Sequence, residues 1–239
     1  MTRRCTDVFI QWFEKHMTPA TAAKQWIKRS VLRPWMTCAG ARATGQVALT
    51  FDDGPHPEHT RRFLRVLDKH VAKATFFCVG TNLRRHPEIA AEILAAGHEI
   101  SNHSMTHAKF AGLGYAEIAR EFDEVFALED DFGQPFTSSR YIRPPEGVIN
   151  LGVLRYCAVR RVRIAYWNRD PRDYATHAAD EMVGKFKDQP LVSGDIVLLH
   201  DDVPHGPQAV DQVLQMMQVA SLKAVTVSTL LGTHATSTT

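Results

Sequence analysis

Short apolar runs alternate with amphipathic segments from residue 46 onwards, and this alternation is the feature that most constrains the fold. Strands are expected over residues 46–51, 74–79, 98–101, 140–143, 162–167, 195–200 and 224–228. Helices are expected between them, over residues 58–70, 87–96, 115–131, 151–159, 177–187 and 208–221. Strands that alternate with helices pair in parallel, in a layered or barrel α/β fold. The sequence therefore predicts an α/β barrel with about seven parallel strands.

The charge of the chain is concentrated at its N-terminus. Residues 1–42 contain eight Lys or Arg and two Asp or Glu, a net charge of +6, whereas the whole chain of 239 residues has a net charge of +2 and the remainder therefore −4. We predict a basic amphipathic helical arm over residues 1–42, with helices over 7–16 and 18–34. A linker is expected over 36–45, a folded domain over 46–230 and a frayed tail over 231–239.

Large apolar residues alternate with Lys and Arg in this arm. They are Trp12, Phe13, Trp26, Ile27 and Trp35. This composition is typical of an interfacial helix on anionic lipid, which would associate the protein peripherally with an anionic membrane through residues 1–42. The alternative, which we favour, is that the apolar stripe packs on the barrel or on a neighbouring subunit.

Composition and patterning exclude several other classes of protein. With 44% hydrophobic and 23% charged residues, the chain is neither disordered nor fibrous. It contains no signature that reads RNA or DNA, so no nucleic-acid partner is expected. Without an apolar run of about 18 residues or a signal peptide, we expect a cytoplasmic protein, at most bound to the inner face of the membrane. The four cysteines lack the spacing of a zinc finger or a disulfide framework, and Cys78 and Cys157 are expected to be buried free thiols.

Five clusters of His, Asp and Arg follow the carboxyl ends of predicted strands. They are Asp52-Asp53-Gly54-Pro55, His103-Ser-Met-Thr-His107, Arg143-Pro144-Pro145, Asp170-Pro-Arg-Asp173 and His200-Asp201-Asp202. In an α/β barrel these strand ends converge on the face where active sites are built. Polar residues are common in any loop, but the polar residues here are mostly His, Asp and Arg, which favours one shared site.

The histidine and aspartate clusters are typical of a metal site. His103 and His107 are four residues apart, so one helical turn would place both rings on one side. Asp52 or Asp53 can supply the third ligand of a catalytic zinc site with an open position. The other aspartate would then be free to take a proton from a metal-activated water. The alternative is that both aspartates cap or terminate a local turn.

The remaining clusters suggest two supporting pairs. Arg143, stiffened by the prolines that follow it, can pair with a carboxylate and keep it ionised. Asp173 can bind one ring nitrogen of His200, leaving the other nitrogen to protonate a leaving group. The alternatives are a surface salt bridge for Arg143 and a packed core position for His200.

The ordered motifs resemble those of the polysaccharide deacetylases, carbohydrate esterase family four, which include chitooligosaccharide, chitin and peptidoglycan N-deacetylases. The resemblance rests on T-F-D-D-G-P (50–55), H-S-M-T-H (103–107), R-P-P (143–145), D-P-R-D-Y (170–174) and L-L-H (198–200), and T-F-F-C-V-G (75–80) is similar to the second strand of the family. It covers residues 46–230. It implies a distorted (β/α) barrel and a metal-dependent hydrolase that removes an acetyl group from an N-acetylated polysaccharide, oligosaccharide or cell-surface glycan precursor.

The resemblance also implies a role for each matching residue. Asp52 would be the general base and Arg143 would orient it. Asp53, His103 and His107 would hold a divalent metal, most often zinc, with cobalt, nickel, manganese and iron as alternatives.

On the leaving-group side, the resemblance makes His200 the general acid, tuned by Asp173. The substrate-contacting positions that it implies are Pro145, Glu146 through its N–H, and Tyr174 and Leu198 in the acyl pocket. The sequence departs from the family pattern at two of these positions. Glu146 replaces the usual Tyr, and Tyr174 replaces the usual Trp. Both changes affect the identity of the substrate more than the reaction.

Three alternatives remain open from sequence. The same machinery would serve a deformylase or an O-deacetylase acting on a lipid- or nucleotide-linked sugar. A non-catalytic carbohydrate-binding protein would keep the barrel, although such proteins tend to lose a ligand or the acid, and every polar role is filled here. A scaffold recruited through the arm would lose its association when residues 1–42 are removed.

Overall fold

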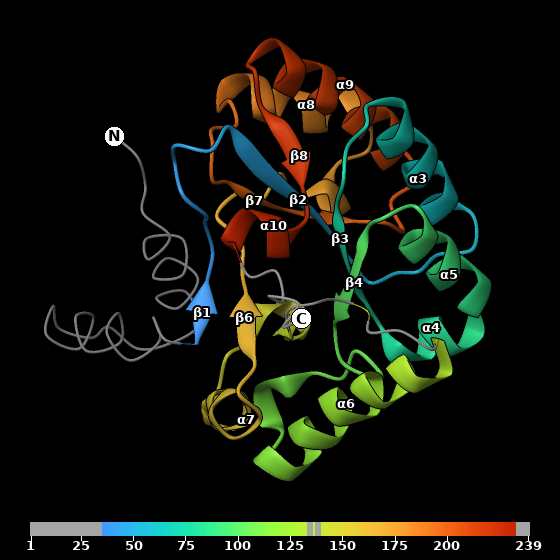
Figure 1. Cartoon of the computed structure of the whole chain (residues 1–239), viewed down its shortest axis with the longest axis vertical. Helices are drawn as coiled ribbons and strands as arrows, with labels where there is room; N and C mark the ends of the chain where they lie inside the picture. The colour runs from blue at the N-terminus through green and yellow to red at the C-terminus, as the bar shows by residue number, and fades with distance from the viewer. Residues whose placement is uncertain (1–34, 133–135, 137–139, 233–239) are drawn as a thin grey trace, which may run out of the picture.

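Eight parallel strands form one sheet in the computed structural model, which describes residues 35–132, 136 and 140–232 (Figure 1). They are β1 (Met36–Thr37), β2 (Gln46–Asp52), β3 (Thr75–Cys78), β4 (Glu99–Asn102), β5 (Tyr141–Ile142), β6 (Arg163–Ala165), β7 (Ile196–His200) and β8 (Lys223–Val225). The spatial order is β1-β6-β5-β4-β3-β2-β7, and β8 pairs with β2 beside β7. Because every pairing is parallel, all the carboxyl ends lie at one end of the sheet.

Each of the seven expected strands overlaps an observed one, and the eighth lies where a linker was expected. The prediction of a linker over 36–45 is wrong at its start, because Met36 and Thr37 pair with Ile164 and Ala165 of β6. A strand of two residues has no period for a sequence pattern to reveal. It exists because a neighbouring strand offers it hydrogen-bond partners.

The two edges of the sheet approach each other and close a distorted barrel, as predicted. Gly40 N–H donates to the carbonyl of Gly194 (2.8 Å), and Leu198 N–H donates to the carbonyl of Arg169 (2.9 Å). Isolated bridges join Ala39 to Asp195 and Arg169 to Val197. The seam therefore rests on single bridges rather than on a continuous ladder.

Helices surround the sheet (Figure 1). The α-helices are α3 (His59–Lys69), α4 (Gly80–Arg85), α5 (Pro87–Ala95), α6 (Tyr115–Ala127), α7 (Leu151–Arg160), α8 (Ala179–Asp188), α9 (Gly206–Val219) and α10 (Val227–Leu231). Short 3₁₀ turns occur at η1 (Phe110–Gly112), η2 (Leu128–Phe132), η3 (Pro145–Gly147) and η4 (Asp173–Ala175). The short helices α4 and α10 were not expected. The helix expected over 115–131 tightens into η2 after Ala127, and the strand expected over 224–228 gives way to α10.

Apolar side chains fill both faces of the sheet. The six residues of β2 after Gln46 are all buried, as in strands covered on two sides. Phe51 packs between Phe63 of α3 and Phe76 of β3, in the layer beneath the helices. A smaller cluster includes Phe77 of β3 and Leu230 of α10. Helix α10 therefore joins this second cluster and fixes the C-terminal end of the described chain.

The cysteines and the arm differ in how far the structure tests them. Cys78 and Cys157 are free and buried, as predicted, but Cys38 is disulfide-bonded, so the expectation of no disulfide is wrong. A disulfide depends on which residues meet in space, and spacing along the chain does not reveal that.

Residues 1–34, with both predicted arm helices, lie outside the described residues. Trp35, also assigned to the arm, packs against a core cluster. Within the part of the chain described, no helix is long and apolar enough to cross a membrane.

Candidate active site

Strand β2 ends in a turn that carries two aspartates side by side. Asp53 has φ 76°, and the peptide bond between Gly54 and Pro55 is cis. A strand would point Asp52 and Asp53 to opposite faces, but the left-handed backbone at Asp53 interrupts that alternation. The side-chain amide of Asn82 donates to the Asp53 carbonyl (2.8 Å) and holds the turn against α4. Both carboxylates therefore reach the same site.

The two histidines lie on a loop after β4, so the prediction of a helical turn is wrong. Ser104 and His107 have φ 68° and 55°, which reverses the chain within four residues. The N–H of His107 donates to Oγ of Ser104 (3.0 Å). The Nε2 atoms of His103 and His107 lie 3.4 and 3.2 Å from Oδ1 of Asp53. The loop thus brings the rings together, as the helix was expected to do.

These three residues fit a divalent cation. One ligand atom from each of Asp53, His103 and His107 lies within 4.8 Å of the others. Oδ1 of Asp53 is buried and makes no hydrogen bond of good geometry. Nδ1–H of His103 donates to the carbonyl of Arg143 (2.7 Å), which leaves Nε2 as the ring atom that faces Asp53.

The electrostatics of this group also favour a positive charge. Burial opposes ionisation of Asp53, but the close approach of His103 and the charges of His103 and His107 lower its pKa to about 2. Burial alone would lower the pKa of His103, but the charges of Asp52 and Asp53 raise it above its ordinary value. The environment thus stabilises negative charge on Asp53 and positive charge on His103. The same negative potential at the imidazoles would attract a metal cation.

Arg143 is fully buried, and both hydrogen bonds and stacking of its guanidinium on an aromatic ring hold it in place. Its Nη1 donates to Oδ1 of Asp52 (2.6 Å) and to Oγ1 of Thr50 (2.8 Å), and its Nε donates to the carbonyl of Ala165 (2.9 Å). The guanidinium carbon lies 3.9 Å from the ring centre of Phe77. The alternative of a surface salt bridge is therefore wrong. Thr50 was not expected to take part. It lies two residues before Asp52 and begins the T-F-D-D-G-P motif, but nothing in the motif indicated a contact with Arg143.

The second pair joins His200, at the end of the neighbouring strand β7, to Asp173 of η4. His200 is the register partner of Asp52 across β2 and β7. Its Nδ1 lies 2.8 Å from Oδ1 of Asp173, and its N–H donates to Oδ2 of the same carboxylate (2.7 Å). Burial lowers the pKa of His200, but the hydrogen bond and charge of Asp173, together with Asp52 and Asp53, raise it to about 9. The raised pKa favours the protonated form of His200 at neutral pH, and the ring lies close enough to Asp52 and Asp53 to interact with their charges.

The expected substrate contacts lie around these pairs with different exposure. Pro145 is buried in η3, whereas Glu146 is exposed and has φ 54°. Tyr174 is 61% exposed and meets the His200 ring edge-on at 5.5 Å between ring centres. Leu198 is buried in β7 on the same side of the strand as His200. Tyr174 and Glu146 are therefore the two of these positions most open to a ligand.

Asp201 supports the site, and the sequence analysis assigned it no role. It is fully buried, its N–H donates to the Asp52 carbonyl (3.3 Å), and the Thr60 hydroxyl donates to its Oδ2 (2.5 Å). A Cβ at Gly54 would lie 2.1 Å from that same Oδ2. Burial raises the pKa of Asp201 to about 7, with the Thr60 hydrogen bond acting in the opposite direction. Its position in the His200-Asp201-Asp202 cluster was the available signal.

Comparison with known proteins agrees with this arrangement. The family model of polysaccharide deacetylase matches residues 39–161. The chain belongs to the polysaccharide deacetylase family. A chitooligosaccharide deacetylase of Bradyrhizobium is 38% identical over 167 residues, which cover 69% of this chain and 74% of the relative. The resemblance drawn from the motifs is confirmed.

Two further relatives extend the match towards the C-terminus. A peptidoglycan-N-acetylglucosamine deacetylase of Bacillus cereus is 36% identical over 190 residues, covering 77% of this chain and 87% of the relative. The crystal structure of the peptidoglycan N-acetylglucosamine deacetylase Bc1960 superimposes with a TM-score of 0.79 at 25% identity, covering 91% of this chain and 98% of that one. The expected barrel is therefore the fold of the polysaccharide deacetylase family.

Proposed function

We propose that this chain is a divalent-metal-dependent hydrolase that removes the acetyl group from an N-acetylated sugar in an oligosaccharide, a polysaccharide or a cell-surface glycan precursor. The observation that carries the proposal is the convergence of one aspartate and two histidines within 4.8 Å, next to a buried Arg–Asp pair and an Asp–His pair. An amide hydrolase needs a base for water and an acid for the departing amine, and the two pairs would supply them.

The proposed reaction uses one proton acceptor and one proton donor. Asp52 takes a proton from the attacking water while the water oxygen bonds to the amide carbonyl carbon. His200 gives its proton to the amide nitrogen as the C–N bond breaks, so acetate and a free amine are released. The N–H of Glu146 donates to the carbonyl oxygen as negative charge develops on it. Arg143 orients Asp52 through their 2.6 Å hydrogen bond, and Asp173 orients His200 and raises its pKa.

Asp53, His103 and His107 would hold the metal, and we propose zinc because an aspartate with two imidazoles suits a tetrahedral site with one open position. When bound, such a cation polarises a carbonyl and lowers the pKa of a water molecule.

The test of this function is acetate release from N-acetylglucosamine oligomers by protein of known metal content. We expect acetate release that a chelator abolishes and added zinc restores. His103→Ala should lose both metal and activity because it removes a ligand. Asp52→Asn should keep the metal and lose at least about a hundredfold in kcat, within the range of a general base.

Full activity of Asp52→Asn would contradict the assigned base. Release of formate from formamido sugars, or of acetate from esters alone, would indicate the deformylase or O-deacetylase instead. Binding of oligomers without any turnover would indicate a carbohydrate-binding protein.

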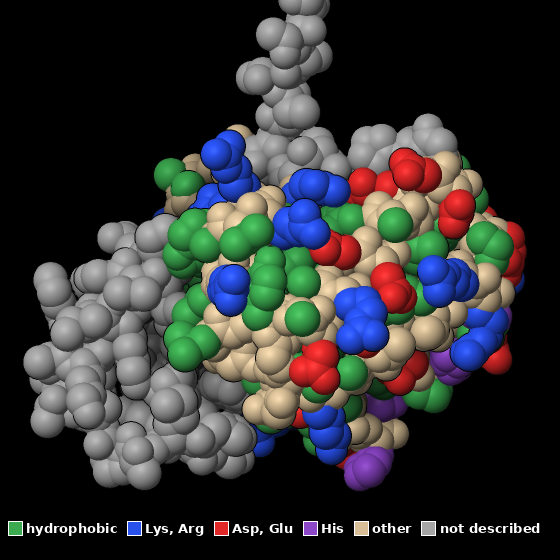
Figure 2. Space-filling model, turned by 90° about the horizontal axis from the view of Figure 1, so that it is seen from below, with side chains coloured by type: hydrophobic (Ala, Val, Ile, Leu, Met, Phe, Trp, Pro, Cys, Tyr) green, Lys and Arg blue, Asp and Glu red, His purple; other side chains and the backbone are tan. Residues whose placement is uncertain are grey.

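We keep membrane association of residues 1–42 as a second, separate proposal, supported by the net charge of +6 on that segment. The face seen in Figure 2 carries acidic and basic side chains interspersed, so the described residues there offer no competing basic patch. The intact protein should co-sediment with vesicles that contain anionic lipid, and 0.5 M salt should release it, because screening weakens such attraction to roughly a 4–5 Å range. Absence of binding at low salt would leave the packing interpretation of the arm.

The cytoplasmic location stays a prediction. Cys38 is disulfide-bonded, and disulfides persist in oxidising compartments outside the cytoplasm. Cell fractionation would decide between a cytoplasmic and an exported protein.

A further inference from the structure

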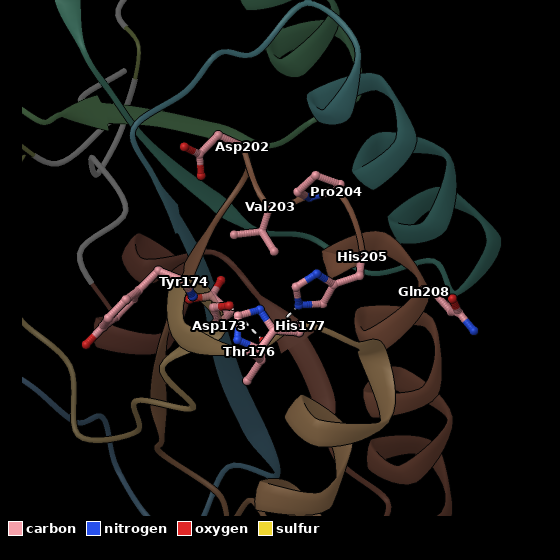
Figure 3. A pocket seen from close by; sticks show the side chains of 9 residues that line it. All are labelled: Asp173, Tyr174, Thr176, His177, Asp202, Val203, Pro204, His205 and Gln208. Atoms are coloured by element: carbon pink, nitrogen blue, oxygen red, sulfur yellow. Dashed lines mark hydrogen bonds between the residues drawn. The ribbon is translucent and has the colours of Figure 1, made fainter.

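An open pocket of about 650 Å³ adjoins the candidate active site (Figure 3). It lies between residues 173–177, which begin with η4, and the loop 202–205 that follows β7. Asp173 belongs to both places, because its side chain holds His200 at 2.8 Å. A substrate longer than one sugar could therefore occupy the site and the pocket together.

Hydrogen bonds fix the polar wall of the pocket in one arrangement. The Thr176 hydroxyl donates to the carbonyl of Asp173 (2.7 Å), so its oxygen accepts from Nε2–H of His205 (2.8 Å). Figure 3 shows the His205 ring directed at Thr176 across the pocket. This fixes the tautomer and orientation of the imidazole, as a preformed ligand site requires.

The wall carries hydrogen-bonding groups but no cation. The nine residues that line the pocket include two histidines, one glutamine and one threonine, and none is Lys or Arg. Asp202 is exposed and lies close enough to Asp53, His200 and Asp173 to interact with their charges. An anionic ligand would therefore meet the Asp202 carboxylate, whereas hydroxyls and amines would meet acceptors and donors.

The pocket also offers apolar surface next to the polar groups. Val203 and Pro204 line it, and Tyr174 stands at its border with His200. A flat, exposed aromatic ring beside hydroxyl-binding groups suits the apolar face of a pyranose.

We propose that this pocket is a subsite for the sugar next to the acetylated one, that it accepts an uncharged or amine-bearing sugar, and that it rejects an acidic one. The proposal rests on the proposed deacetylase function and names the class of substrate chain that the site takes.

Chain length tests the subsite. We expect kcat/KM to rise at least fivefold from N-acetylglucosamine dimers to tetramers. His177→Ala and Gln208→Ala should each lower the tetramer value about fivefold, the worth of one hydrogen bond, and change the dimer value less than twofold. Gln212→Ala is the matched control, since Gln212 lies one turn further along α9 and its side chain reaches Asp180 of α8.

Charge tests the selectivity. A tetramer whose neighbouring sugars carry carboxylates should be used at least about tenfold less well than the neutral tetramer. Asp202→Asn should reduce the ratio of kcat/KM for the neutral tetramer to kcat/KM for the acidic one. Added salt should reduce the same ratio for the wild-type protein, because it screens the charges. Asp188→Asn, an exposed change at the end of α8, should leave the ratio as it is.

Calorimetry with fully deacetylated glucosamine tetramers separates the two proposals, because these ligands cannot react. Weaker tetramer binding in His177→Ala than in Gln212→Ala supports the subsite even if no acetate is ever released, an outcome that would overturn only the deacetylase. Equal binding by both variants, or acetate release that does not depend on chain length or charge, overturns the subsite and leaves the deacetylase standing.

Discussion

Arg143 positions two functional groups by two different parts of the residue. Its guanidinium holds the Asp52 carboxylate, and its carbonyl accepts the Nδ1–H of His103. Burial lowers the pKa of Arg143, and the charge of Asp52 and the hydrogen bond with it act in the opposite direction. The buried guanidinium therefore depends on Asp52 for its charge to be compensated. Breaking such a buried pair leaves one charge unpaired and costs about 3–5 kcal/mol. The base and one proposed metal ligand are thus oriented by the same residue.

The Asp173–His200 pair predicts a pH dependence. With its pKa raised to about 9, His200 stays protonated through neutral pH, and activity that needs this acid should fall as pH rises through about 9. In Asp173→Asn the burial that lowers the pKa of His200 remains, and the charge of Asp173, the largest of the charges that raise it, is lost while those of Asp52 and Asp53 stay. The alkaline limb of kcat/KM should therefore move down by about 1–3 pH units. Rates measured from pH 6 to 10 at fixed zinc concentration check this.

The same pair should also stabilise the fold over a defined range of pH. Because the folded-state pKa is raised, its contribution is fully present below the ordinary histidine value of about 6.5 and is lost as pH rises through about 9. Urea unfolding at pH 6 and pH 10 should show the larger deficit of Asp173→Asn at pH 6. Asp188→Asn serves as the control for the unfolding measurements. In the pH–rate measurements, an alkaline limb that Asp173→Asn leaves unchanged would contradict the assignment of His200 as the acid.

At the scale of elements, the site depends on a turn rather than on a helix or a strand. Asp201, which directly follows β7, donates its N–H to the carbonyl of Asp52 in the turn after β2. The Asp201 carboxylate packs so close to Gly54 that no side chain fits there. The turn is also held by Asn82 of α4. Elements from three parts of the chain therefore determine where Asp53 lies.

Gly54→Ala tests that arrangement. Its Cβ would lie 2.1 Å from Oδ2 of Asp201, so the turn must shift. We expect a loss of about 1–3 kcal/mol in unfolding free energy and about 10–100-fold weaker zinc binding. Gly112→Ala is the matched control because nothing lies within 4 Å of its new Cβ. Zinc affinity equal to that of the control would show that Asp201 does not hold the turn.

At the scale of the whole molecule, the barrel closes at a seam of isolated bridges and side-chain hydrogen bonds instead of a continuous strand ladder. Gly194, with φ +87°, lies at the seam against Gly40. The nearby Asp195 carboxylate is buried and binds both Arg42 and Asn168. This cluster ties residues 40–42, just after β1, to the start of β7, and so holds the two edge strands together.

Gly194→Ala should open or strain this seam. The new Cβ would lie 2.6 Å from the carbonyl oxygen of Gly40, in addition to the cost of a left-handed backbone. We expect a loss of about 2–4 kcal/mol by urea unfolding. Gly232→Ala isolates the backbone cost, since its φ is +65° and nothing lies within 4 Å, and it should lose about 1–2 kcal/mol. Equal losses in both variants would mean that the seam tolerates the side chain.

The layered architecture and the residues of the candidate site could be predicted from the amino-acid sequence. Buried runs such as 46–52 and the helices between them are periodic, and burial on one or two faces imposes that period directly on the sequence. The site residues could be named because each follows a strand end and matches a family motif. How these side chains meet could not be predicted, because it depends on contacts between distant parts of the chain. The His103–His107 loop, the β1 strand and the support from Asp201 depend on partners distant in sequence, and no local pattern records such contacts.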